Sequence, residues 1–263
     1  MPPEPGWPAL DLFFASHPWH GVAIGADAPA RVTVYVEIVP SDTVKYELDK
    51  DSGLLKVDRP QLYSNVCPAP YGFVPRTLCG PEVARFAEEK LGRRGLVGDD
   101  DPLDILVLTE KDFTHGNILV QALPIGGLAM LDGSEVDDKI VAVMVKDAVY
   151  GGVQDLSHLP SLLVDRLKHY FLTYKQAPSE AHPACELTRV YGRDEAFEVI
   201  RRSQAHRQDQ GRREGGEDPG GVFGPYPLSG QGQYRLFSPG KDDVGISYQP
   251  CFDRFLLARL LLL

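Results

Sequence analysis

Alternating apolar and polar residues predict the first strand of the chain. Between residues 32 and 39, Val32, Val34, Val36 and Ile38 occupy every second position, and polar or aromatic residues stand between them. A period of two places the apolar side chains on one face of an extended segment. We therefore expect a strand with one face turned toward a core.

A hairpin is predicted directly after this strand. Residues 45–48 alternate again, with Lys45 and Glu47 on one face and Tyr46 and Leu48 on the other. The turn-forming residues 49–53 follow and lead into an apolar stretch at 54–57. Two alternating runs joined by such a turn are typical of a β-hairpin.

Further short strands predict the fold class. Apolar runs indicate strands at 105–108, 118–123 and 140–145, and residues 131–139 are expected to form a hairpin loop between the last two. Short strands separated by turn signals are typical of a closed or partly closed barrel. The chain is therefore expected to be mainly β.

Helical periodicity comes later and makes the expected class α+β. Residues 82–91 have helical spacing and good helix formers, and residues 195–202 are expected to form another helix. Pro160 suits the first position of a helix. It is followed at helical spacing by Leu163, Leu167, Phe171 and Tyr174.

Composition divides the chain into three regions. Residues 1–30 are rich in Pro, Gly and Ala, which predicts an irregular arm. Within it we interpret His17-Pro18-Trp19-His20-Gly21 as a packed aromatic turn, and a metal-binding histidine pair is the less favoured alternative. Residues 31–202 form the expected domain. Residues 203–263 are rich in Gly and Pro without periodicity, so they bury too little apolar surface to offset their ordering entropy, and we expect a mostly disordered tail.

Charge and cysteine content exclude several classes of protein. The 263 residues carry 37 Asp+Glu against 27 Lys+Arg, a net charge of -10, whereas a general nucleic-acid binder would show a basic patch. Four scattered cysteines show no zinc spacing and indicate reduced thiols. Asp11 interrupts the apolar residues 10–14, so a signal peptide is not expected. The apolar residues 255–263 are too few to span a bilayer as a helix. We expect a soluble cytoplasmic protein without a membrane or nucleic-acid partner.

A dense acidic motif carries the clearest chemistry. Asp99, Asp101 and Asp104 lie in one short segment with Pro102, immediately before an apolar strand. Clustered anions are unfavourable unless cations compensate them, and carboxylate oxygens suit magnesium or calcium. A solvated acidic loop and an EF-hand calcium loop are the alternatives. An EF-hand loop would need glycine where Asp104 stands.

The motif Asp99-x-Asp101-Pro102-Leu103-Asp104 resembles the signature of soluble family I inorganic pyrophosphatases. Residues 65–76 and Pro124-Ile125-Gly126-Gly127 most resemble a branch of that family found in chlamydia-like bacteria and some photosynthetic eukaryotes. The resemblance spans about residues 30–176. The other matches, in the family's order, are Glu37, Lys45-Tyr46-Glu47, Asp49-Lys50-x-Ser52-Gly53, Val57-Asp58-Arg59, Pro70-Tyr71-Gly72, Asp132, Asp137-x-Lys139 and Tyr174-Lys175.

The resemblance implies a fold, a reaction and cofactors. The fold would be a five-stranded OB-type barrel with flanking helices. The reaction would be hydrolysis of pyrophosphate to two orthophosphates, dependent on several Mg²⁺ ions, with Mn²⁺ or Zn²⁺ as substitutes and Ca²⁺ as an inhibitor. Family members form dimers or hexamers, so a homo-oligomer is expected.

The resemblance also implies roles for single residues. Asp101 would be the general base for the attacking water, and Tyr71 would lie in the pocket wall close to the metals. The metal ligands and their supports would be Asp99, Asp104, Asp132, Asp137, Glu37 and Glu47. The groups that grip the phosphoryl oxygens would be Lys45, Arg59, Lys139, Tyr174 and Lys175.

The chain departs from the family pattern at several positions. Cys67 stands where the family usually has a second active-site tyrosine. Activity should survive, and the alternatives are a thiol whose oxidation inhibits the enzyme and a small buried residue. Leu123 replaces an arginine, and residues 80–97 are an additional stretch. A catalytically weak homologue that senses phosphate and a calcium-binding structural domain are the rival functions. The presence of the expected ligands and cations favours the enzyme.

Overall fold

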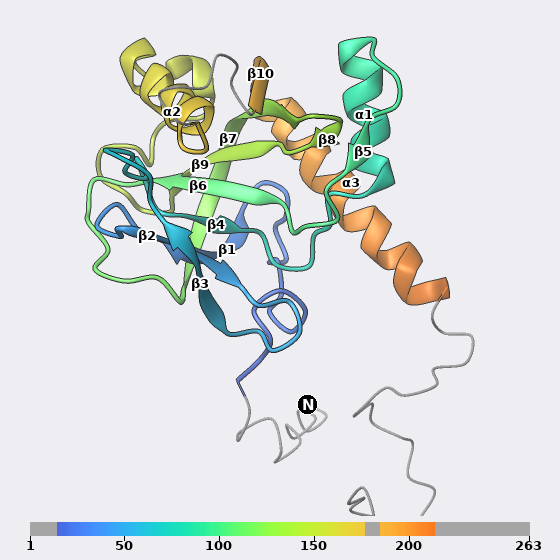
Figure 1. The fold of residues 1–263 in the computed structure, drawn as a ribbon, viewed down its shortest axis with the longest axis horizontal. Coiled ribbons are helices and arrows are strands. Elements are labelled where there is room, and N and C mark those ends of the chain that lie inside the picture. Colours follow the sequence, from blue (N-terminus) through green and yellow to red (C-terminus); the bar gives the residue numbers. More distant parts are fainter. Residues whose placement is uncertain (1–14, 177–184, 214–263) are drawn as a thin grey trace, which may run out of the picture. The chain divides into compact units, whose positions relative to one another are not determined.

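The computed structural model describes residues 15–176 and 185–213, and its central feature is an eight-stranded mixed sheet (Figure 1). These residues all belong to the first of two units, 1–216 and 217–263. The strands are β1 (Val32–Ile38), β2 (Val44–Leu48), β3 (Leu55–Pro60), β4 (Tyr71–Phe73), β5 (Val97–Gly98), β6 (Asp104–Leu108), β7 (Ile118–Asp132), β8 (Glu135–Val136), β9 (Lys139–Met144) and β10 (Cys185–Gly192), and the helices are α1 (Pro81–Leu91), the 3-10 helix η2 (Leu156–His158), α2 (Ser161–Thr173) and α3 (Arg193–Arg213).

The strand pairings form a continuous path. The order is β1-β4-β6-β9-β7-β8-β5, β10 also pairs with β7, and β2 and β3 form a separate two-stranded sheet. A further pairing of β7 with β1 connects the two ends of the β1-β4-β6-β9-β7 segment. The strands do not stand evenly around one axis, so the architecture is a mainly β mixed sheet with few helices, and the closed OB-type barrel stays a prediction.

The strand predicted first is confirmed, but both of its faces are buried. Val32, Val34 and Val36 contribute to the largest apolar cluster of the described residues. Tyr35, on the other face, packs in a second cluster with Phe73. Burial of both faces explains how Glu37, which is only 7% exposed, comes to lie inside the protein.

The longest strand corrects the expected hairpin loop at 131–139. β7 was predicted to end near residue 123, but it continues to Asp132 and turns directly into β8. The strand passes Pro124 through a bulge between Pro124 and Gly126. A Cβ at Gly126 would lie 2.4 Å from the carbonyl oxygen of Tyr191. Gly126 therefore permits close approach of β10.

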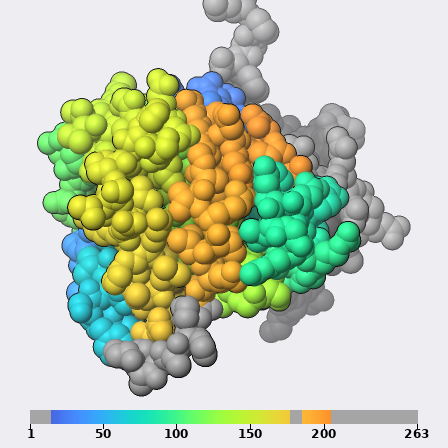
Figure 2. Space-filling model, turned by 90° about the horizontal axis from the view of Figure 1, so that it is seen from above, coloured from blue at the N-terminus to red at the C-terminus, as the bar shows by residue number. Residues whose placement is uncertain are grey.

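The three α-helices lie where helical spacing predicts them, and α3 extends further than expected. Figure 2 shows residues 185–204, in orange, between α1 and the α2 region. Phe86 of α1 and Val199 and Ile200 of α3 share the largest apolar cluster. Since α3 runs to Arg213, the expected boundary between residues 202 and 203 falls inside a helix. The remainder of the expected tail, 214–263, lies outside the described residues, as do residues 1–14 of the expected arm.

Among the described residues, no helix is both long enough and apolar enough to cross a bilayer.

Candidate active site

Segments far apart in the sequence line a single cavity of about 360 Å³. The side chains come from β1, the β2–β3 hairpin, β4, the acidic segment 99–104, the 132–139 region and the C-terminal end of α2. Every residue that the resemblance assigns to the site lines this cavity: Glu37, Lys45, Glu47, Arg59, Tyr71, Asp99, Asp101, Asp104, Asp132, Asp137, Lys139, Tyr174 and Lys175.

The floor of the cavity is built by two neighbouring parallel strands. β6 and β9 pair so that Asp104 stands opposite Lys139. The Lys139 side chain is 2% exposed, and its ammonium forms ion pairs with the carboxylates of Asp104 and Asp137. The Tyr71 hydroxyl donates a hydrogen bond to Asp104 from β4. The floor is therefore a part-buried network in which one buried ammonium lies between two carboxylates.

Burial makes this part of the cavity unfavourable for negative charge. Burial, followed by the charge of Asp104, raises the pKa of Glu37 to about 8. Burial is also the main reason that the pKa of Asp99 is raised to about 7. Burial raises the pKa of Asp104 despite Lys139. At Asp137 burial acts in the same direction, but the charges of Lys139, Lys175 and Lys45 and the hydrogen bond from Lys139 together outweigh it and lower the pKa. Additional positive charge in the cavity would therefore favour the ionised carboxylates.

The β2–β3 hairpin supplies one wall of the cavity. Its ladder places Lys45 opposite Arg59. The Lys45 ammonium lies 3.7 Å from a Glu47 oxygen and 3.3 Å from an Asp58 oxygen, and Arg59 also pairs with Asp58. The Leu48 amide donates to the buried Glu37 carboxylate at 2.7 Å. Glu37 thus links the hairpin to β1.

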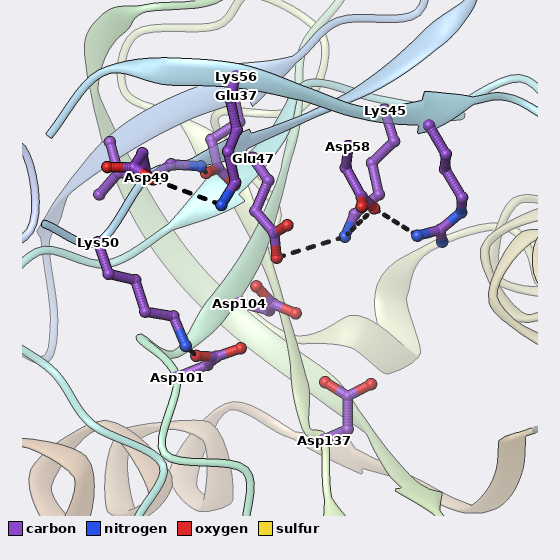
Figure 3. Close-up of polar contacts among 12 residues, drawn as sticks. Glu37, Lys45, Glu47, Asp49, Lys50, Lys56, Asp58, Asp101, Asp104 and Asp137 are labelled. Carbon is purple, nitrogen blue, oxygen red and sulfur yellow. Dashed lines mark hydrogen bonds and ion pairs between the residues drawn. The ribbon is translucent and has the colours of Figure 1, made fainter. Parts of the chain in front are cut away.

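The acidic segment and the end of α2 complete the site. Figure 3 shows the carboxylates of Glu47, Asp101, Asp104 and Asp137 pointing into a common space. The Asp101 amide donates to the Asp99 carboxylate at 3.0 Å, and the Asp101 carbonyl accepts a hydrogen bond from the Cys79 amide at 2.8 Å. The Asp101 backbone is therefore fixed while its carboxylate faces the cavity.

The acidic residues of the cavity pair with lysines. Lys175 from the end of α2 contacts Asp132 at 2.7 Å, and Lys50 contacts Asp101. Within residues 15–176 and 185–213, no three His, Cys, Asp or Glu side chains gather around one point in metal-ligand fashion. The donor set still suits hard divalent cations, because it consists of carboxylate oxygens whose crowding in a buried cavity favours bound positive charge.

Several lining residues were not assigned to the site from the sequence. Lys50, Asp58, Glu135 and Trp19 also border the cavity. Lys50 and Asp58 belong to matched motifs, which could have indicated them, and Trp19 belongs to the aromatic turn of the arm. Glu135 carries no local signal, since an acidic residue in a tight turn is ordinary.

Cys67 is not among the side chains that line the cavity. The thiol is fully buried and lies 3.1 Å from the Ala69 carbonyl oxygen, to which it donates. Burial raises the pKa of this thiol to about 12. The position therefore holds a small buried residue, and its thiol is poorly suited to react with oxidants.

Comparisons with known proteins agree with this geometry. A model of the inorganic pyrophosphatase family matches residues 34–208. The inorganic pyrophosphatase of Chlamydia trachomatis serovar L2 is 50% identical over 190 residues, covering 71% of this chain and 91% of that protein. A soluble inorganic pyrophosphatase of Zea mays is 43% identical over 162 residues, covering 62% of this chain and 67% of that protein.

A solved structure of an inorganic pyrophosphatase has a similar fold. The crystal structure of inorganic pyrophosphatase from Thermus thermophilus aligns with a TM-score of 0.61 at 28% identity, covering 74% of this chain and 99% of that chain. The residues matched by the family model include all lining residues of the cavity except Trp19.

Proposed function

The chain belongs to the inorganic pyrophosphatase family and is a hydrolase acting on pyrophosphate, and from this premise we propose that its reaction depends on Mg²⁺ and uses Asp101 as the general base. The observation that carries the proposal is the convergence of all assigned carboxylates, cations and tyrosines on one cavity. Phosphoryl transfer needs chiefly positioning and charge neutralisation, and this set of side chains can provide both.

The carboxylates of the cavity are the proposed metal ligands. Asp99, Asp104 and Asp137 would hold Mg²⁺ on the floor, and Asp132 would share a further ion with Asp137, while Glu37 and Glu47 support the group. When bound, such ions would neutralise phosphoryl oxygens and make a water molecule acidic enough to attack near neutral pH. Mn²⁺ and Zn²⁺ are the expected substitutes, and Ca²⁺ the expected inhibitor.

The cations of the cavity would hold the substrate. Lys45 and Arg59 project together from the hairpin, and Lys175 enters from α2 with its ammonium 5.5 Å from the centre of the Tyr174 ring. Arg offers two parallel hydrogen bonds to a phosphate, and lysine a compact point charge. Lys139 adds charge from the floor. These groups would bind both phosphoryl groups and stabilise the leaving phosphate.

Asp101 would accept the proton of the attacking water. Its side chain is 39% exposed and pairs with the exposed Lys50, so the carboxylate can reach a water molecule in the cavity. The Asp104 side chain is less exposed, at 26%, and is held by both Lys139 and Tyr71. Tyr71 would keep Asp104 oriented. This difference in environment supports proton acceptance by one acid of the segment and metal binding by its neighbours.

Phosphate release from pyrophosphate tests the proposal. We expect rapid release with Mg²⁺, none with a chelator, and a loss of about 10²- to 10⁴-fold in kcat for Asp101→Asn. Asp100→Asn is the matched control, because Asp100 has a φ of 56°, a conformation that asparagine tolerates well. An active Asp101→Asn variant would refute the general base alone, whereas a folded wild-type protein without turnover under any divalent metal would refute the enzyme.

The homo-oligomeric state and the cytoplasmic location are proposed from the resemblance. Light scattering of the purified full-length chain would test the first, and a monomeric mass at micromolar concentration would contradict it.

A further inference from the structure

The aromatic turn of the N-terminal arm contacts the turn of the β2–β3 hairpin. The arm folds on itself through a 2.7 Å hydrogen bond from the Gly21 amide to the His17 carbonyl. The His17 Nε2 lies 3.0 Å from the Lys50 carbonyl oxygen, which belongs to the hairpin turn. This contact joins residues 33 positions apart.

The hydrogen bonds of His17 define which ring nitrogen carries the proton. Nδ1 accepts from the amides of Trp19 at 3.2 Å and His20 at 3.3 Å. An accepting Nδ1 is unprotonated, so the proton of the neutral ring is on Nε2. Nε2 is then the donor to the Lys50 carbonyl, and both ring nitrogens are used to fix the arm against the hairpin.

The hairpin turn is shaped to receive the imidazole ring. Gly53 has a φ of +72°, and a Cβ there would lie 2.8 Å from His17 Cδ2. The Asp49 carboxylate accepts bonds from the Ser52 amide at 3.0 Å and the Ser52 hydroxyl at 2.7 Å. The turn is therefore internally bonded, and the ring occupies the space that any larger residue at position 53 would fill.

Trp19 ties the same arm to the domain. Its indole N–H donates to the Thr77 carbonyl at 2.7 Å, and the Arg76 amide donates to the Trp19 carbonyl at 2.9 Å. The indole is 7% exposed and packs in a cluster with Leu48 and Phe73. The arm therefore connects the core of the domain to the hairpin turn through hydrogen bonds and packing.

The arm holds Lys50 by its backbone carbonyl, and the Lys50 side chain faces Asp101 in the cavity. Figure 3 shows its side chain running from the hairpin to the Asp101 carboxylate, with which it forms an ion pair. The two side chains are 50% and 39% exposed, so the pair adds little to the stability of the fold. Its significance lies in its position, because it connects the hairpin to the proposed general base.

We propose that Lys50 is a positioning residue for Asp101, and that His17 positions Lys50 by holding the hairpin turn. The inference rests on the proposed function of Asp101. A carboxylate at the mouth of a cavity can rotate toward solvent, and the Lys50 ammonium keeps it turned toward the opposite wall. The arm, which lies outside the residues matched by the family model, thereby becomes part of the active site.

A double-mutant cycle tests whether His17 acts through Lys50. The full-length variants are His17→Ala, Lys50→Gln and the two combined, assayed for kcat/KM with saturating Mg²⁺. Loss of one hydrogen bond predicts about a three- to tenfold decrease for His17→Ala, and loss of a charged contact about ten- to a hundredfold for Lys50→Gln. If His17 acts through Lys50, His17→Ala changes the Lys50→Gln enzyme by less than about twofold.

A matched control separates this role from general destabilisation. Lys56 lies in the same hairpin, is 54% exposed, pairs with Asp49 and is not a lining residue of the cavity, so Lys56→Gln should keep wild-type kcat/KM. Equal losses from His17→Ala in both backgrounds would overturn the coupling, and wild-type activity in Lys50→Gln would overturn the role of Lys50. An inactive wild-type protein would instead refute the proposed function.

Discussion

Asp104 and Lys139 stand opposite each other in the parallel ladder between β6 and β9, and their side chains form an ion pair on the floor of the active-site cavity. The pairing register of two strands thus places a cation beside the acidic motif. Asp137, two residues before Lys139, meets the same ammonium. The backbone ladder therefore determines the relative position of three charged groups that the sequence separates into two segments.

Replacement of Lys139 by Met should destabilise the protein strongly in the absence of metal. The substitution removes the buried ammonium that compensates the part-buried carboxylates of Asp104 and Asp137. The loss should approach the ~3–5 kcal/mol that removing one partner of a fully buried ion pair costs. Urea unfolding with a chelator measures this loss, and Mg²⁺ should recover part of it.

Lys175→Met is the matched control for that measurement. The Lys175 and Asp132 side chains are 31% and 40% exposed, so this pair should contribute less than about 1 kcal/mol. Equal losses of unfolding free energy in Lys139→Met and Lys175→Met would show that the Lys139 network is no more stabilising than the Lys175–Asp132 pair.

Gly72→Ala should unfold or severely weaken the domain. A Cβ at Gly72 would lie 1.9 Å from the carbonyl oxygen of Tyr35 in the neighbouring strand, and the β1–β4 pairing would have to open. Overpacking against a backbone atom predicts a loss of about 3 kcal/mol or more in the free energy of unfolding. Gly152→Ala, where a Cβ meets nothing within 4 Å, should remain close to wild type in thermal unfolding.

Asp147→Asn should remove stability at neutral pH but not in acid. The Asp147 carboxylate accepts hydrogen bonds from the Tyr150 amide at 2.7 Å, and from the Glu110 amide and Thr109 hydroxyl at 2.8 Å. These bonds outweigh the opposing effect of burial and lower its pKa from the usual 3.8. A lowered folded-state pKa gives stability that is complete above the unfolded pKa and lost as pH falls through the folded one.

The unfolding free energies of wild type and Asp147→Asn should therefore differ by about 2 kcal/mol at pH 7. They should begin to converge as pH falls below the usual carboxyl pKa and meet only below the lowered folded-state pKa. Asp165→Asn provides the comparison, because that carboxylate is 60% exposed and pairs with Lys168 on the surface of α2. A difference between wild type and Asp147→Asn that grows as pH falls would contradict the assignment.

Cys67 should react slowly with thiol reagents in the native protein. Its complete burial and raised pKa leave almost no accessible thiolate. Mass spectrometry after timed alkylation should show modification of Cys67 only under unfolding conditions. Cys67→Ala should then have the same sensitivity to peroxide as wild type, and rapid native labelling at Cys67 would refute its burial.

The local patterns of the sequence predicted the elements whose signals are strong and short-range. Alternation identified β1, and turn residues between two alternating runs identified the β2–β3 hairpin. The length of β7 could not be predicted, because the close approach of Tyr191 to Gly126 is a tertiary contact that no local pattern encodes. β10 was missed for a related reason, since its alternation is weak and its place depends on pairing with β7.

Prediction of the site was limited in the same way, because part of it depends on tertiary contacts. Asp99, Asp101 and Asp104 could be identified as one acidic motif because they are adjacent in the chain. Lys139, at 2% exposure, would be read as a solvated lysine from its surroundings in the sequence. Only the resemblance placed it with the acids, and the contact between His17 and Lys50 depends on a tertiary approach that no local pattern encodes.

The order in which the lining segments occur along the chain has a consequence for biosynthesis. Synthesis releases a protein from its N-terminal end, whereas Tyr174 and Lys175, which complete the cavity, follow α2. A nascent chain that has not yet exposed α2 contains the hairpin and the acidic floor but lacks the cation that pairs with Asp132. We expect pyrophosphate turnover to begin only when translation of the domain is nearly finished.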